Sequence, residues 1–360
     1  MNELRNGAID ELRGMAFLAV LVSHIGLVYG LDLRLAYAMA IPAFGVGVDL
    51  FFVISGFVIA RNLADMRDRA AGDGLSSAAA FWLRRVVRIT PPVWATAATI
   101  AAVRLAFAPV GYSADLVAGA GFYANFYWAA CMAGQEGVCP SPLITSHFWS
   151  LALEMQFYAL APALAALPRA LAGIGLAGVL IVGATLERPV GGLLWSLRPD
   201  GLLLGMVLAD QAARRAAWLR ALPRIGLMQA AYWMFVAAMT ARLATGPISG
   251  LGLTVVASIC AYVVAARLTT GASAGPLAGW LRKGGEASYA AYLVHLPVLS
   301  GVHAALAGAP PALSLMAALA GVALATVALD AAFVKPAASL GRRWSDAIIK
   351  NCKMRRGAYN

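Results

Sequence analysis

One stretch of the chain sets a carboxylate in strongly apolar surroundings, at Trp149–Tyr158 (WSLALEMQFY). His147, Ser150, Glu154 and Tyr158 follow one another at steps of three or four residues, so on a helix they share one narrow face. A carboxylate within a membrane is costly, and it normally faces protein or water and serves a function. We therefore predict a catalytic Glu154 with His147, Ser150 and Tyr158 binding substrate. The alternative is an interhelical contact in which Glu154 pairs with an arginine.

A second candidate group lies near the N-terminus, in IDELRGMAFLAVLVSH at residues 9–24. Arg13 and His24 are eleven residues apart. On a helix this step is about three turns, so the two side chains share a face with about 16 Å between them along the axis. Asp10 precedes Arg13 by three residues and is placed to orient it, and we count Asp10 with His24 among the candidate catalytic residues. An imidazole exchanges protons readily near neutral pH, which suits a general base for a hydroxyl nucleophile. A structural histidine bonded to a backbone carbonyl, with Arg13 as a flanking charge, is the alternative.

Asp49 is another acid in apolar surroundings, within GVGVDLFFVISGF at residues 45–57. A carboxylate in this setting needs a cation or hydrogen-bond donors. Both a structural ion pair and a catalytic role are open for Asp49. In the catalytic role, Asp49 or Glu154 orients the imidazole of His24.

Arg85 and Arg88 lie three residues apart, just before Pro91 and Pro92. We predict that the two prolines open the next membrane span, because proline is favoured in the first turn of a helix. Paired guanidinium groups on one face suit bidentate binding of phosphate. The alternative is a plain cluster of basic residues that fixes membrane topology.

His295 is the last polar candidate, in GEASYAAYLVHLPVL at residues 285–299. It shares a helical face with Ser288 and Tyr292, which indicates either a substrate contact or an ordinary packed imidazole. The chain has no zinc-ligand spacing and no phosphate-binding or dinucleotide fingerprint rich in glycine. We therefore predict no metal.

The composition requires a membrane around these residues. The chain of 360 residues is 61% hydrophobic and 12% charged, with a mean hydropathy of +0.75, which leaves too little polar surface for a soluble globule. Apolar stretches recur at residues 11–30, 46–60, 90–108, 147–166, 169–186, 198–212, 225–244, 247–266, 286–306 and 311–334. We predict an all-α polytopic membrane helical bundle of about ten transmembrane helices.

The basic residues set the orientation. Most of the 28 Lys and Arg residues fall on one side of the membrane if both termini are cytoplasmic. Reading Leu116–Met132 as an eleventh span would put the basic C-terminal segment outside, so we predict an interfacial or re-entrant segment within an outer loop at 109–146. Cys131 and Cys139 share that loop, either as a disulfide or as two free thiols.

We divide the chain into a membrane domain at residues 1–340 and a basic cytoplasmic tail at 341–360. The tail suits contact with anionic lipid at the inner leaflet. The net charge of +11 follows from the distribution of cations over inner loops, so we expect no nucleic-acid partner.

Five segments together resemble acyltransferase family 3, the bacterial membrane acyltransferases that modify glycans and some small metabolites. The resemblance covers essentially the whole chain, and the order and spacing of the segments agree with it. One departure is Glu11, where the family commonly has a small residue. The segments are IDELRGMAFLAVLVSH, GVDLFFVISGFVIA, LRRVVRITPP, HFWSLALEMQFYALAP and GEASYAAYLVHLPV.

The resemblance implies transfer of an acyl group, usually acetyl, from cytoplasmic acyl-CoA to a hydroxyl group of an acceptor at the outer face of the bacterial inner membrane. By position, Arg13 and His24 match the family's motif on the first helix, and Arg85 and Arg88 match its paired arginines. Glu154 and Asp49 match its acidic positions.

These expectations combine into one mechanism. Arg85, Arg88 and Arg13 bind the phosphates of acyl-CoA, and the donor's arm extends along the first helix. His24 deprotonates the acceptor hydroxyl or carries the acyl group transiently, while Glu154 or Asp49 orients the imidazole. We expect the partners to be acyl-CoA, a glycan or other hydroxyl-bearing acceptor, membrane lipid and, as an option, a second copy of the chain. The rival hypothesis is a proton-coupled transporter or flippase of a polysaccharide precursor.

Overall fold

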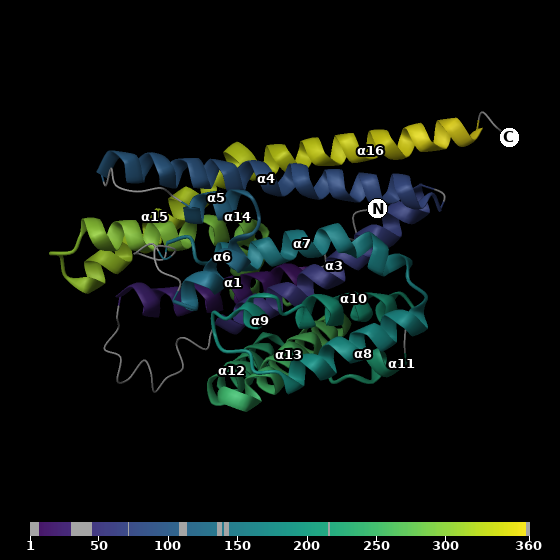
Figure 1. The fold of residues 1–360 in the computed structure, drawn as a ribbon, viewed down its shortest axis with the longest axis horizontal. Helices are drawn as coiled ribbons and strands as arrows, with labels where there is room; N and C mark the ends of the chain where they lie inside the picture. Colours follow the sequence, from purple (N-terminus) through teal and green to yellow (C-terminus); the bar gives the residue numbers. More distant parts are fainter. Residues whose placement is uncertain are drawn as a thin grey trace.

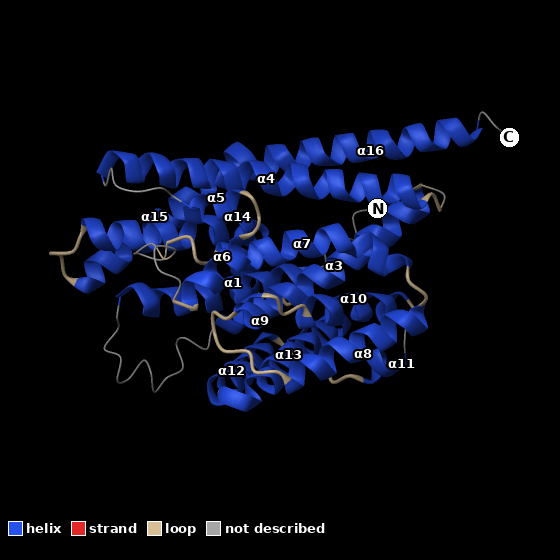
Figure 2. Cartoon of the chain, viewed as in Figure 1, coloured by secondary structure: helices blue, strands red, loops and turns tan. Residues whose placement is uncertain are grey.

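The computed structural model describes residues 7–29, 45–70, 72–107, 114–134, 139, 144–214 and 217–357. Within these residues all regular structure is helical (Figure 2). This agrees with the predicted fold class.

Each of the ten apolar stretches contains a helix. The helices run α1 Gly7–Tyr29, α3 Gly47–Arg69, α4 Gly74–Phe107, α5 Ala114–Ala120, α6 Ala124–Met132, α7 Phe148–Ala166, α8 Arg169–Thr185, α9 Leu193–Ser196, α10 Asp200–Ala213, α11 Ala217–Ala221, α12 Leu227–Leu243, α13 Ser249–Thr270, α14 Pro276–Ala305, α15 Pro311–Leu329 and α16 Lys335–Gly357. Among the described residues, five helices are long and apolar enough to cross a membrane, which makes this a multi-pass membrane protein. They are Gly7–Tyr29, Gly47–Arg69, Gly74–Ala106, Gly246–Thr270 and Pro311–Cys352. The full number of spans and their orientation stay predictions.

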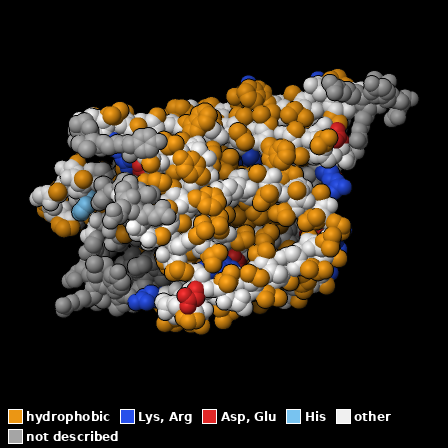
Figure 3. All heavy atoms as spheres, viewed as in Figure 1, with side chains coloured by type: hydrophobic (Ala, Val, Ile, Leu, Met, Phe, Trp, Pro, Cys, Tyr) orange, Lys and Arg blue, Asp and Glu red, His pale blue; other side chains and the backbone are white. Residues whose placement is uncertain are grey.

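The surface agrees with a lipid environment. Apolar side chains cover much of the face shown in Figure 3 and are not gathered into one patch. On α8, Ile174 and Ile181 are 69% and 65% exposed. Water disfavours such exposure, whereas lipid tails accept it.

One prediction about α4 is wrong. Pro91 and Pro92 do not open this helix but lie inside it, because α4 begins at Gly74 and continues to Phe107. Proline within a helix leaves the carbonyl one turn before it without its usual donor, and packed neighbours commonly supply other donors in membrane helices. The carbonyls concerned in α4 are those of Val87 and Arg88. Next to them, the Tyr289 hydroxyl of α14 donates to the carbonyl of Ile89 at 2.8 Å and joins α14 to this part of α4. The helix therefore carries Arg85 and Arg88 in its middle.

The aromatic segment Leu116–Met132 does not form one continuous helix. It divides into α5 and α6 around Gly121 and Phe122, and Phe122 has a positive φ of 57°. Seven and nine residues are too few to cross a membrane, which requires about 20. Cys131 of α6 forms a disulfide with Cys139. Of the two states considered for these cysteines, the structure has the bridged one.

The C-terminal segment is helical over its described residues. A π-helical turn at Asp330–Val334 joins α15 to α16, so the proposed boundary at residue 340 falls inside a helix. α16 lies alongside α4 (Figure 1). Arg69 and Asp346 form an ion pair at 2.6 Å, and the Cys352 thiol lies 3.2 Å from a carboxylate oxygen of Asp73.

Glycines allow the close helix crossings that position the candidate residues. At Gly14 of α1 and Gly285 of α14, an added Cβ would overlap the backbone of the other helix, at Leu281 and Asp10 respectively. Small residues at such crossings let membrane helices approach closely. The crossing brings Arg13, next to Gly14 in the sequence, to the pocket lined by Gly285 and its neighbours on α14.

Candidate active site

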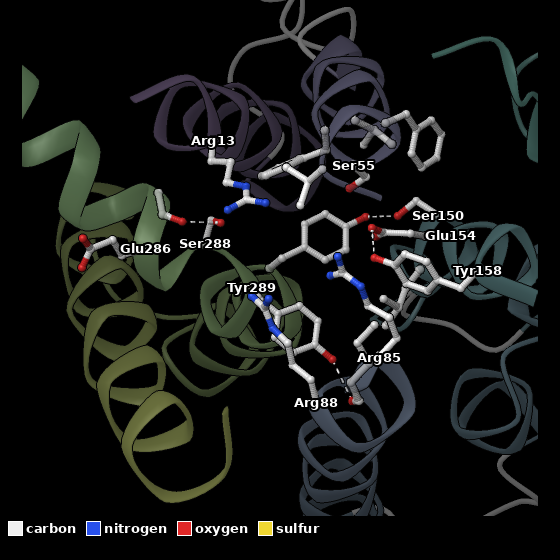
Figure 4. A pocket seen from close by; sticks show the side chains of 18 residues that line it. Arg13, Ser55, Arg85, Arg88, Ser150, Glu154, Tyr158, Glu286, Ser288 and Tyr289 are labelled. Carbon is white, nitrogen blue, oxygen red and sulfur yellow. Dashed lines mark hydrogen bonds between the residues drawn. The ribbon is translucent and has the colours of Figure 1, made fainter. Parts of the chain in front are cut away.

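A pocket lies between α1, α3, α4, α7 and α14 (Figure 4). Its empty volume, including the open mouth, is about 910 Å³. One part of the wall is polar and charged, and the rest is apolar. The lining residues are Arg13, Val48, Phe51, Phe52, Ser55, Val58, Arg85, Arg88, Ile89, Ser150, Leu151, Glu154, Tyr158, Gly285, Glu286, Ser288, Tyr289 and Tyr292.

Three arginines from two helices line this pocket. Arg13 comes from α1, and Arg85 and Arg88 come from α4; in Figure 4 all three side chains extend toward the same space. Arg13 lies 3.6 Å from the carboxylate of Asp10. Within the described residues, neither Arg85 nor Arg88 has an acid within ion-pair distance. Their positive charges are therefore available to an anionic ligand.

Aromatic rings hold Arg85 in place. Its guanidinium lies 5.6 Å from the centre of the Phe81 ring and 5.2 Å from that of the Tyr158 ring. Only 9% of the residue is exposed. Contacts with ring faces stabilise a cation without neutralising it, so Arg85 keeps its charge beside the pocket.

The predicted stripe on α7 is present. Ser150, Glu154 and Tyr158 line the pocket together, and the Tyr158 hydroxyl donates to Glu154 at 2.5 Å. His147, at the start of α7, is buried and does not line the pocket. Three of the four residues predicted to share this face therefore line the pocket, and the fourth, His147, is buried away from it.

Asp49 lies in a buried ion pair. The Arg198 side chain donates to both of its carboxylate oxygens, at 2.9 and 3.1 Å. The same guanidinium lies over the rings of Trp149 and Trp195, 4.9 and 4.3 Å from their centres. Neither Asp49 nor Asp10 lines the pocket. Arg198 lies 149 positions from Asp49, so the sequence did not indicate this partner.

Three histidines from three helices meet beside the pocket. Nε2 of His295 lies 3.3 Å from Nδ1 of His24, and the rings of His295 and His147 are 5.0 Å apart between centres. His295 is fully buried and His147 is 1% exposed. Among the described residues, no group of three or more His, Cys, Asp and Glu side chains suits a metal ion. The cluster is an assembly of imidazoles.

Tyr292 connects the histidines to the pocket. It lines the pocket, and its ring lies 5.5 Å from that of His147 and 5.4 Å from that of His295. Its hydroxyl donates to the His147 carbonyl at 2.9 Å and lies 2.5 Å from the Ser150 hydroxyl. Sequence reasoning placed Tyr292 on the face of His295 but did not include it in the site. The three-residue spacing of Tyr292 and His295 was the sequence feature that could have indicated Tyr292 as a site residue.

The contacts of Glu11 explain why this chain has a carboxylate where the family commonly has a small residue. It is fully buried and accepts hydrogen bonds from Arg267, from Arg282 at 2.7 Å and from the backbone N–H of Ser273 at 2.8 Å. These partners join the start of α1 to α13 and α14. A buried carboxylate with two cationic partners is a stable arrangement only while all members remain.

Comparison with known proteins supports one family. The family model described as an acyltransferase domain matches residues 6–330. Peptidoglycan O-acetyltransferase OatA of Listeria monocytogenes is 31% identical over 163 residues, covering 43% of this chain and 23% of that protein. O-acetyltransferase OatA of Staphylococcus aureus is 30% identical over 161 residues, covering 43% of this chain and 24% of that protein.

The matched region thus spans about a quarter of the length of these relatives. No solved structure shows a significant match. The family match covers the helices that carry the arginine pocket and the three histidines. The chain belongs to acyltransferase family 3.

Proposed function

We propose that the protein transfers an acyl group, in the simplest case acetyl, from acyl-CoA to a hydroxyl group of a glycan at the outer face of the bacterial inner membrane. The observation that carries the proposal is the connection of a pocket with three arginines to a buried histidine cluster through Tyr292. Family membership favours this activity over the transporter hypothesis.

The donor side of the reaction rests on the arginines. Coenzyme A carries several phosphate oxygens, and guanidinium groups bind such oxygens through charge-assisted hydrogen bonds. Arg85 and Arg88 have no acid within ion-pair distance among the described residues. The apolar lining of the pocket, which includes Phe51 and Phe52, suits the pantetheine arm.

The acceptor side rests on His24. In the proposed step, the acceptor hydroxyl gives its proton to His24 and its oxygen attacks the thioester carbonyl. The new C–O ester bond forms, the C–S bond breaks, and the CoA thiolate takes the proton back from His24 and leaves as the free thiol. Nδ1 of His147 is buried and has no hydrogen-bond partner among the described residues. It is therefore suited to accept a hydrogen bond from a hydroxyl group of the glycan substrate.

Glu154 lies in the part of the pocket where we place acyl-CoA. It lines the pocket with the arginines and accepts the Tyr158 hydrogen bond. We infer that it positions Tyr158 and balances part of the positive charge when no donor is bound. The relatives named peptidoglycan O-acetyltransferase and O-acetyltransferase favour an acetyl donor and an envelope glycan as the acceptor.

The test is turnover of acetyl-CoA by purified protein in nanodiscs, followed as release of free thiol with and without a crude envelope glycan. Wild type, His24→Ala and a control, His303→Ala, are compared. Release that depends on both the glycan and His24, with full activity in the control, supports the proposal. Full release by His24→Ala, or no release by folded wild type with any short acyl-CoA, contradicts it.

A further inference from the structure

The geometry of the histidine cluster points to a partner for His24 that is not a carboxylate. The sequence left Glu154 and Asp49 as the residues that orient this imidazole. In the structure Asp49 is held by Arg198, and Glu154 accepts from Tyr158. Within the described residues, the hydrogen-bond partners of His24 are the Val20 carbonyl and His295.

Backbone carbonyls determine where the protons lie on these two rings. Nδ1 of His295 lies 2.7 Å from the Tyr292 carbonyl, and Nδ1 of His24 lies 2.9 Å from the Val20 carbonyl. A carbonyl oxygen only accepts, so each Nδ1 carries a hydrogen. In the neutral rings Nε2 is then bare on both.

This assignment gives the contact between the rings a direction. Nδ1–H of His24 donates to the bare Nε2 of His295 at 3.3 Å and shares its hydrogen with the Val20 carbonyl. Among the described residues nothing donates to Nε2 of His24, so its lone pair is available, as a general base requires. His295 is fully buried and is held by the Tyr292 carbonyl, so its acceptor atom is fixed.

We propose that His295 is the positioning residue for His24 and acts as a neutral hydrogen-bond acceptor in the place where a catalytic triad has a carboxylate. It holds the imidazole with Nε2 free and accepts a stronger hydrogen bond once His24 has taken the proton of the acceptor hydroxyl. This inference rests on the proposed function and replaces the substrate-binding role predicted for His295. A neutral acceptor suits this site, because a lone carboxylate buried among aromatic rings would need a cation of its own.

The kinetic test compares His295→Leu and His295→Gln with wild type and with His303→Ala, a control on the same helix. Leucine has no acceptor, whereas the glutamine carbonyl reaches the position of Nε2. We expect His295→Leu to lower kcat about 10- to 100-fold, as loss of an orienting partner does elsewhere, with the KM for acetyl-CoA unchanged. His295→Gln should recover most of that loss. An unchanged kcat in His295→Leu, or a rise in the KM for the acceptor alone, would overturn the proposal.

A second measurement does not depend on turnover. The chain has four histidines, so the ring nitrogens in a sample labelled with ¹⁵N-histidine can be assigned by removing them one at a time. We expect His295 at pH 7 to be neutral, with hydrogen on Nδ1 and none on Nε2. A hydrogen on Nε2 of His295 would overturn the proposal even if turnover were normal. Absence of turnover with the expected nitrogen signals would instead count against the proposed function alone.

Discussion

Arg85 and Arg198 are two buried arginines with similar aromatic contacts, and they should respond differently to the same substitution. The side chain of Arg198 is 4% exposed and paired with Asp49. Arg85 is 9% exposed, and no acid lies within ion-pair distance of it among the described residues. We expect Arg85→Gln to impair binding of coenzyme A and Arg198→Gln to impair folding.

The magnitudes follow from what each substitution leaves behind. A hydrogen bond to a charged group contributes about 1.5–3 kcal/mol, so Arg85→Gln should raise the Kd for coenzyme A roughly 10- to 150-fold. Its effect on stability is limited to the ring contacts, about 1 kcal/mol. Arg198→Gln leaves Asp49 buried and unpaired, which costs about 3–5 kcal/mol. At about 2 °C per kcal/mol for a chain of this size, its Tm falls by about 6–10 °C.

The assay uses the two free cysteines of the described chain, Cys260 and Cys352, which are buried. A thiol-reactive dye reports their exposure on heating and so gives Tm, while titration calorimetry gives the Kd for coenzyme A. The reasoning is refuted if folded Arg85→Gln binds coenzyme A as wild type does. It is also refuted if Arg85→Gln loses as much Tm as Arg198→Gln.

Three further predictions concern stability, each measured as Tm. Gly56→Ala should lower the free energy of unfolding by about 1–3 kcal/mol, because the added Cβ would overlap the Leu202 backbone. Gly178→Ala has open space around it and should be neutral or stabilising. Equal Tm values for the two variants would contradict this. Reduction of the Cys131–Cys139 disulfide, which joins residues eight positions apart, should cost roughly 2–3 kcal/mol, and the double alanine variant should not respond to reductant. Hydrogen bonds from Ser76 and then Cys352 lower the pKa of Asp73 from 3.8 to about 2. The ionised carboxylate therefore stabilises the fold. This contribution to stability is complete above pH 3.8 and is lost as the pH falls through about 2. The Tm advantage of wild type over Asp73→Asn should therefore shrink between pH 4 and pH 2, and a constant difference would count against it.

The sequence predicted the helices better than their ends. Hydropathy located the helix in each apolar stretch because membrane burial requires long apolar runs. It placed the start of α4 near Pro91, yet that helix begins at Gly74. The part of α4 that precedes Pro91 packs against α16 near Arg84, and hydropathy does not report a helix whose support comes from another helix.

Among the candidate site residues, relations within one helix could be predicted from the sequence, whereas contacts between helices could not. Periodicity placed Ser150, Glu154 and Tyr158 on one helical face, and the spacing of Arg85 and Arg88 placed these two on one face as well. In the structure all five residues line the pocket. These relations lie within single helices, where geometry follows from the number of residues between two positions.

The partners across helices were decided by tertiary structure alone. Asp49 meets Arg198 and His24 meets His295, over separations of 149 and 271 positions. Such pairs depend on which helices cross and at which glycine, and that follows from side-chain packing throughout the bundle. The sequence by itself determined which chemical groups lie within the apolar helices, and packing decided which of them meet.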